Sequence, residues 1–434
     1  MVLRTKYLGL IVAALVPITP LITWAQPVRV VVAQAHAPDA TFTARPANGN
    51  QFHTISDNAD LFAGDLIVSL PGGVVSSKNS AVSLKALSDF DGRSPLPILE
   101  TAFSLNDPQD VDFDFVLDRG RVDLTNSKKE GAAVVRLRFW DQVWKIALDE
   151  PNTRVAVELC GRWSSGSRFK VAERGSDPAK IPAPVATLVL LVLKGSATVN
   201  LAGVTLALKS PPGPAELRWN SLTGARPQPL KLEKLPDWGD PETKLSEQGQ
   251  KVAAAIEKFR QARTGDPIKA VDSFLASSDP VELRIALVSL GGQDELQKMG
   301  KALSEAKSME EWDFGITILR HWLGRARGQD QKLYSTLIEL RGYTSDEAKT
   351  VVQMLFGFSD TDIVQPETYE VLIEYLKHEK PGVRNLAAWH LVRLFPAGKS
   401  IPFKPNGMKD DNEKVYEAWK KLIPTGKVPP LFDK

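Results

Sequence analysis

The sequence predicts a multidomain protein in which an N-terminal all-β domain, a sandwich or an irregular barrel, precedes a C-terminal all-α domain. Residues 52–222 contain short β-branched and aromatic runs separated by Gly, Pro, Asn and Asp, a pattern typical of strands and turns. Residues 223–244 are rich in proline and lack apolar periodicity, which indicates a linker. From residue 245 to 434 the apolar residues recur at helical spacing. The chain has 434 residues, more than one hydrophobic core usually serves.

Alternation of apolar and polar residues predicts the individual strands. Val111, Phe113 and Phe115 fall on one face of an extended segment, and the aspartates at 110, 112 and 114 fall on the other. A hairpin is predicted across Asp141 and Gln142. Other predicted strands cover residues 66–70, 81–87, 134–139, 143–148, 187–193, 197–201 and 204–208.

Two helix starts are marked by a proline in the first turn. Asp279 precedes Pro280, and Lys380 precedes Pro381, which is where proline is tolerated in a helix. About ten helices of ordinary length fit between residue 245 and the C-terminus.

The first 25 residues are predicted to be a signal peptide. Arg4 and Lys6 precede an apolar stretch over residues 8–22, and the small residues at 23 and 25 suit a signal peptidase, with cleavage after Ala25. Residues 26–51, rich in Ala, Pro and Thr, are predicted to be a linker. We therefore expect a periplasmic, cell-surface or secreted protein, and contact with the membrane only through this segment if it is not cleaved.

Charge and cysteine content exclude several classes of protein. Lys and Arg number 54 and Asp and Glu 52, and the predicted leader carries the two extra basic residues, so the mature chain is neutral. A neutral chain without basic runs predicts no nucleic-acid partner. The one cysteine, Cys160, allows neither an intrachain disulfide nor a zinc site built from thiolates.

Three short segments of the β domain carry a family resemblance. Residues 61–66, Leu-Phe-Ala-Gly-Asp-Leu, followed by Gly72-Gly73 and a strand, are similar to the opening of FecR-like periplasmic domains. Residues 117–124 and 193–199 resemble later elements of that family. The resemblance covers about residues 52–222 and implies an extracytoplasmic β domain for interaction or sensing. We expect that the sigma-factor signalling of FecR proteins does not apply, because few residues precede the apolar stretch.

One helix of the second domain carries another resemblance. Residues 383–391, Val-Arg-Asn-Leu-Ala-Ala-Trp-His-Leu, are similar to the second helix of a HEAT repeat. The resemblance implies HEAT-like helix pairs over about residues 245–423. The two proline-marked starts are not separated by a whole number of repeats, so an irregular array is expected.

Motifs for catalysis or cofactor binding are missing from the sequence. Nucleophile elbows and phosphate-binding glycine loops do not occur. The five histidines show no metal-ligand spacing, which favours a surface or helix-end histidine over a metal ligand. The aspartates at 110, 112 and 114 mimic a calcium loop, but Phe115 and Arg121 occupy its glycine and bidentate glutamate positions, which favours a solvated strand face. We predict no cofactor, no metal and no catalytic residues.

Two further possibilities stay open in the β domain. Glu150 and Glu158 are nominal candidates for the acid and base of a glycosidase. The fold, rather than the spacing in the sequence, decides whether two such carboxylates lie close together. Trp140, Trp144 and Trp163 could form a ligand-binding surface on which sugar rings stack, although core packing is the favoured interpretation.

These observations predict an exported, non-enzymatic interaction, scaffold or sensing protein. Its expected partner is an unknown protein of the cell envelope, or a glycan. The alternative is a secreted polysaccharide-active hydrolase or carbohydrate-binding protein that uses the β domain.

Overall fold

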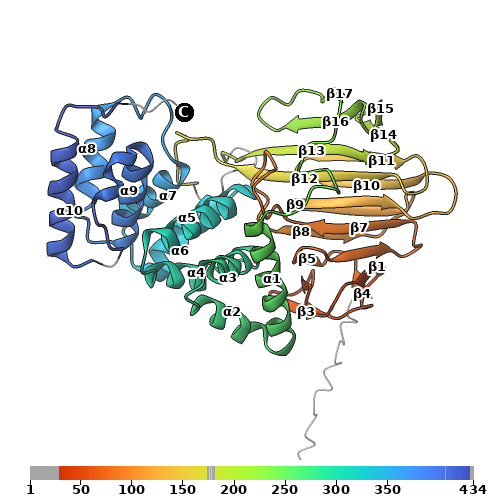
Figure 1. Ribbon diagram of the computed structural model, residues 1–434, viewed down its shortest axis with the longest axis horizontal. Coiled ribbons are helices and arrows are strands. Elements are labelled where there is room, and N and C mark those ends of the chain that lie inside the picture. Colours follow the sequence, from red (N-terminus) through yellow and green to blue (C-terminus); the bar gives the residue numbers. More distant parts are fainter. Residues whose placement is uncertain (1–28, 174, 176, 178–180, 406, 431–434) are drawn as a thin grey trace, which may run out of the picture.

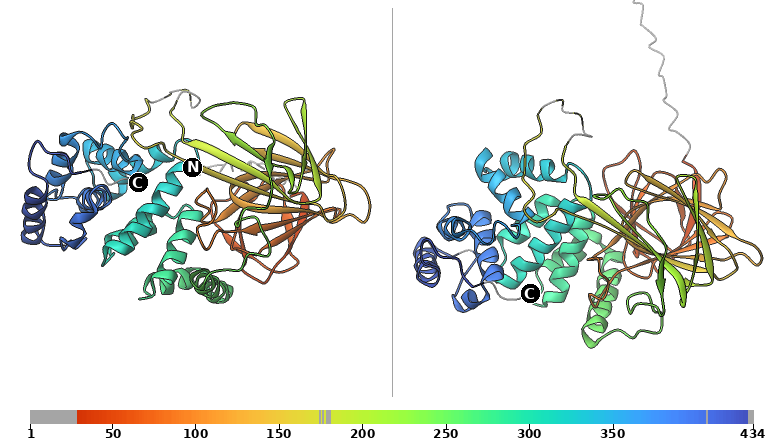
Figure 2. Two further views of the ribbon diagram at one scale, coloured as in Figure 1. Left: turned by 45° about the horizontal axis from the view of Figure 1, so that its top comes forward. Right: turned by 90° about the horizontal axis from the view of Figure 1, so that it is seen from above.

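The computed structural model describes residues 29–173, 175, 177, 181–405 and 407–430. The predicted signal peptide lies outside the described residues. Within them, a large mixed β-sheet region over residues 31–232 precedes an all-α region, so the predicted fold class is confirmed. The two regions lie side by side in all three ribbon views (Figures 1 and 2).

Seventeen strands make up the β region in the described part of the chain. The first nine are β1 Val31–His36, β2 Phe42–Arg45, β3 His53–Ile55, β4 Asp60–Phe62, β5 Leu66–Ser69, β6 Val74–Ser77, β7 Val82–Leu87, β8 Thr101–Asn106 and β9 Phe113–Asn126. The others are β10 Ala133–Phe139, β11 Gln142–Leu148, β12 Arg154–Arg162, β13 Val185–Lys194, β14 Ser196–Leu201, β15 Val204–Lys209, β16 Gly213–Asn220 and β17 Leu230–Leu232.

The strands form two layers that share β9. One layer has the order β3, β2, β5, β8, β9, β10, β11, β14, β15. The other has the order β4, β1, β6, β7, β9, β12, β13, β16, β17. The pair β9–β10 is parallel and the other pairs are antiparallel.

Gly120 lies where β9 passes from one layer to the other. Its φ is +96°, and a Cβ there would lie 2.4 Å from the carbonyl oxygen of Glu100. Only glycine fits this position without strain, because the conformation is left-handed and the neighbouring backbone is in contact.

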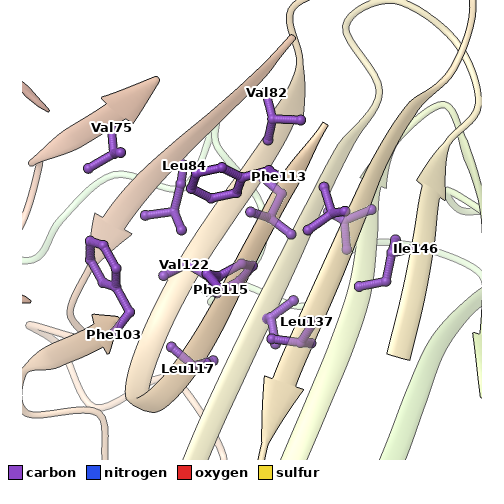
Figure 3. Close-up of a cluster of buried hydrophobic side chains, with 14 of the residues drawn as sticks. Val75, Val82, Leu84, Phe103, Phe113, Phe115, Leu117, Val122, Leu137 and Ile146 are labelled. Carbon is purple, nitrogen blue, oxygen red and sulfur yellow. The ribbon is translucent and has the colours of Figure 1, made fainter. Parts of the chain in front are cut away.

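The hydrophobic core fills the space between the layers. Figure 3 shows Phe103 and Leu137 from one layer close to Leu84 and Val122 from the other, and all four side chains are fully buried. Alternating burial along β10 and β14 follows the period of two that the sequence predicts.

The β region begins earlier than the sequence predicts. Residues 26–51, expected to be a linker, contain β1 and β2, and Val32, Ala33 and Ala35 of β1 are buried. The small alanines carry little β-propensity, which is why the pattern resembled an irregular segment.

The segment predicted to be a linker over 223–244 packs on the β region. It contains β17, and Leu235 and Trp238 pack against the outer face of β12, β13 and β16. The Arg121 guanidinium lies 5.1 Å from the Trp238 ring centroid and donates a hydrogen bond to its carbonyl.

Ten helices form the second region in the described residues. They are α1 Glu247–Gly265, α2 Pro267–Leu275, α3 Pro280–Gly292, α4 Leu296–Ser304, α5 Met309–Gly324, α6 Gln329–Arg341, α7 Ser345–Phe356, α8 Pro366–Tyr375, α9 Pro381–Leu394 and α10 Lys409–Leu422. A short 3₁₀ helix, Pro396–Ser400, follows α9.

Both proline-marked helix starts are confirmed. Helix α3 begins at Pro280, and the Asp279 carboxylate accepts from the Val281 amide; helix α9 begins at Pro381. Along α9, residues 383–391 are all buried, which makes it the central helix of the second core.

Candidate functional site

The end of β12 and the end of α5 touch through their backbones. A Cβ at Gly161 would lie 2.1 Å from the carbonyl oxygen of Gly324, and a Cβ at Gly324 would lie 2.2 Å from that of Gly161. Next to this contact, the Trp163 indole donates a 3.1 Å hydrogen bond to the Leu323 carbonyl and stacks on Phe356 at 4.2 Å between centroids. The two regions therefore meet without space for side chains at this point.

The chain after β12 is bound to the helices by its backbone. The amide of Phe169 donates to the Gln353 side chain at 2.9 Å, and Gln353 donates back to the Ser167 carbonyl at 2.7 Å. The amide of Ala172 donates to Gln331 at 2.9 Å. Glutamines on α6 and α7 thus hold this segment over the helical region.

A polar cavity of about 540 Å³ lies beside this junction. Its volume falls in the range of roughly 300–1,000 Å³ that small-molecule sites occupy. The walls come from the end of β12 and the residues after it, from α5, and from α9. Hydroxyl groups of Ser164, Ser165 and Thr317 and the rings of Trp163 and Trp389 line it.

Positive charge dominates the cavity. Arg162 of β12, Arg320 and His321 of α5, and Arg393 of α9 all line it. Among the residues that the structure describes, no aspartate or glutamate is part of the lining. Guanidinium groups that line one cavity are suited to bind a carboxylate or a phosphate.

Arg320 is the least exposed of the three arginines. Burial, together with the charge of Arg393, lowers its pKa, although an arginine stays protonated at neutral pH. Its guanidinium lies 5.6 Å from the Trp389 ring centroid, and no described carboxylate forms an ion pair with it. Arg393 differs, because it lies 3.4 Å from Asp313 Oδ1 and is more exposed.

A buried ion-pair cluster forms the wall behind the cavity. Glu100, directly before β8, accepts a 2.6 Å hydrogen bond from Arg119 Nε through Oε1, and its Oε2 lies 3.4 Å from His321 Nε2. Arg119 also donates at 2.9 Å to the carbonyl of Gly292, the last residue of α3. One carboxylate therefore joins β9 to α5.

This cluster makes His321 a cation. Burial by itself favours neutral imidazole, but the Glu100 carboxylate and the Cys160 side chain outweigh it and raise the pKa of His321 to about 10. The pKa of Glu100 is lowered: burial opposes ionisation, and the charges of His321 and Arg119 overcome it. His321 adds positive charge to the cavity wall at neutral pH, while its counter-ion Glu100 is not part of the lining.

Cys160 and Glu158 are two further buried residues of β12, and both lie outside the cavity lining. Cys160 on β12 is buried, and its thiol lies 3.9 Å from the Pro97 carbonyl. Glu158 accepts a 2.6 Å hydrogen bond from Ser94 on Oε2, while its Oε1 has no partner among the described residues. Burial raises the pKa of Glu158 to about 7.

The two nominal glycosidase carboxylates are not brought together. Glu158 lies inside β12, and Glu150 is exposed in the turn before that strand. The strand residues from Arg154 to Glu158 alone span roughly 13 Å. A glycosidase pair is separated by about 5 to 10 Å.

The three tryptophans proposed for sugar stacking do not form an exposed row. Trp144 is fully buried and packs edge-on against Phe139 at 5.1 Å. Trp163 is buried in the junction described above. Trp140, half-buried, occupies the β10–β11 turn with a φ of +49°.

The aspartates at the start of β9 are engaged in ion pairs rather than free in solvent. Asp114 is buried and lies 3.0 Å from Arg136 and 2.9 Å from Arg138; Asp112 lies 2.8 Å from Lys128. Only Asp110 retains a largely exposed side chain. In the described ranges, no group of three or more His, Cys, Asp or Glu side chains is placed to hold a metal ion.

Of the residues that line this cavity, the sequence singled out Trp163 as a candidate for a ligand-binding surface, but it did not single out the three arginines. His321 does lie in the last turn of α5, at a helix end, but its side chain is buried. The adjacent pair Arg320-His321 within the otherwise apolar end of α5 is a local signal that two cations are held there. No helix in the described part of the chain is long and apolar enough to cross a membrane.

Comparison with protein-family models, curated proteins and solved structures finds no match to this chain.

Proposed function

We propose that this protein is a non-enzymatic binding protein of the cell envelope whose ligand is an anion held between the β region and the helices. The cationic cavity carries this proposal. It offers three guanidinium groups and an imidazolium from three separate elements, with no acid in its described lining. Arg320 has no carboxylate partner among the described residues, and a bound anion would neutralise its charge.

Export and sensing remain part of the proposal. The N-terminal segment with Arg4, Lys6 and an apolar stretch supports export. The FecR-like segments of the β region and the HEAT-like pattern of α9 support a binding role outside the cytoplasm. Interaction with a protein partner stays a prediction. Such a partner would sense the ligand by binding differently to the protein when the cavity holds the anion.

The walls of the cavity indicate the kind of anion. Trp163 and Trp389 present apolar surface next to Arg320, and Arg393 lies 4.6 Å from the Trp389 ring centroid. A ligand with an anionic group and an apolar body fits better than a bare inorganic ion. Phenyl phosphate is a suitable probe, and benzyl alcohol is its neutral counterpart.

Isothermal titration calorimetry tests the proposal. We expect phenyl phosphate to bind and benzyl alcohol not to bind. Arg320→Gln removes a hydrogen bond to a charged group, which is worth about 1.5–3 kcal/mol. The dissociation constant should therefore rise roughly 10- to 150-fold.

Arg226→Gln is the matched control, because Arg226 is exposed and lies outside the cavity lining. It removes the same charge and should leave the affinity unchanged. Equal binding of the charged and neutral probes, or equal losses in the two variants, would contradict the proposal.

A further inference from the structure

A second cavity lies next to the cationic one and is lined mainly by apolar side chains. It has a volume of about 240 Å³ and lies among α4, α5, α6, α7 and α9. Leu303, Ile316 and Leu337 are among its wall residues, and Arg341 and Thr336 supply polar edges. An apolar space of this size favours a hydrocarbon group over water.

The two cavities follow one another along the same face of α9. Gly382 and Leu386 line the apolar cavity, and Trp389 and Arg393 line the cationic cavity. These positions are spaced by four, three and four residues, so they form a single stripe on the helix. Leu355 of α7 lines both cavities and marks the boundary between them.

Helix α5 also lines both cavities. Trp312, Ile316 and Leu319 line the apolar cavity. Thr317, Arg320 and Leu323 line the cationic cavity. Helices α5 and α9 and the side chain of Leu355 are therefore shared by the two cavities, which places the cationic lining next to the apolar lining.

We propose that the ligand is a single-chain anionic amphiphile, with its head group in the cationic cavity and its hydrocarbon chain along α9 in the apolar cavity. This inference rests on the proposed function and names the class of its ligand. A short anion leaves the apolar cavity unused, and a neutral hydrocarbon leaves the arginines unpaired. A chain that carries one anionic head group satisfies both.

A series of n-alkyl phosphates from butyl to decyl, each kept below the concentration at which it forms micelles, tests the inference by calorimetry. Affinity should rise by up to about fourfold for each buried methylene. Decanoate is compared with decyl phosphate, so that a fatty-acid head group is distinguished from a phosphate head group.

Leu337→Trp fills the apolar cavity and should remove the dependence on chain length while leaving phenyl phosphate affinity unchanged. Leu340→Trp is the matched control, because Leu340 is on the same helix, 54% exposed, and outside the lining. It should retain the full dependence. Arg341→Gln should have little effect, since the head group is assigned to Arg320.

The outcomes separate the two proposals. Binding of phenyl phosphate with no gain from longer chains overturns the amphiphile but leaves the anion site standing. Absence of binding by every probe overturns both. If Leu337→Trp does not fold, hydrogen exchange of the unaltered protein decides: decyl phosphate should protect amides of α4 and α6 that phenyl phosphate leaves unchanged, and equal protection contradicts the inference.

Discussion

Replacement of His321 by glutamine tests the buried cluster that joins the two regions. Glu100 divides its oxygens between Arg119 at 2.6 Å and His321 at 3.4 Å, and both members of the His321–Glu100 pair have side chains only 8% exposed. Removing one partner of a buried ion pair costs about 3–5 kcal/mol. Because Arg119 still neutralises Glu100 in the variant, we expect a smaller loss of about 2–3 kcal/mol at pH 6.

The same pair predicts how stability depends on pH. The pKa of His321 is about 10 in the folded protein, against about 6.5 in the unfolded chain. Its contribution to the free energy of unfolding is complete below pH 6.5 and is lost as the pH rises through 10. Glu100 has a lowered pKa, so its contribution is present above about pH 4.3 and is lost as the pH falls. The pair therefore stabilises the protein most between about pH 5 and 6.5.

Urea unfolding at pH 6 and pH 9.5, followed by circular dichroism, measures both effects. Between pH 6 and pH 9.5, deprotonation of His321 should lower the free energy of unfolding of the unaltered protein by at most about 1.4 kcal/mol per pH unit. The His321→Gln variant should not show this decrease. His53→Gln, at an exposed histidine of β3, should behave like the unaltered protein. A His321→Gln variant that is as stable at pH 6, or that keeps the full pH dependence, would refute the reasoning.

Two further predictions concern the junction and the second buried carboxylate. Gly324→Ala places a Cβ 2.2 Å from the Gly161 carbonyl oxygen and should destabilise the protein by about 1–3 kcal/mol in a thermal melt. Gly265→Ala, which has open space around its Cβ, should be neutral, and equal effects would show that the close contact is not essential. Burial raises the pKa of Glu158 to about 7, so the unaltered protein loses stability as the pH rises from about 4.3 to 7. Glu158→Gln should therefore raise the melting temperature at pH 8 relative to the unaltered protein and leave it similar at pH 5. A lower melting temperature of the variant at pH 8 would contradict the prediction that the Glu158 carboxylate is charged and destabilising there.

Local signals made the fold class predictable. The helix starts at Pro280 and Pro381 depend only on a proline in the first turn, and both are confirmed. The hairpin of β10 and β11 follows from alternation within each strand, although its turn residues are Trp140 and Asp141 rather than Asp141 and Gln142. Strand β1 escaped prediction because alanines supply its buried face.

The cavity was not predictable, because it depends on contacts between distant parts of the chain. Trp163 bonds to a residue 160 positions away, and Arg119 bonds to one 173 positions away. Arg320 and Arg393 lie on separate helices, and each taken alone resembles an ordinary surface arginine. The ion pair of His321 with Glu100, which directly precedes β8, is likewise not encoded by local periodicity.

A crystal structure of the protein grown with phenyl phosphate tests the central claim most directly. We expect the phosphate within hydrogen-bond distance of Arg320, with the ring against Trp163 or Trp389. A cavity that stays empty at saturating phenyl phosphate, or a phosphate bound only elsewhere on the surface, would contradict an anion site between the β region and the helices.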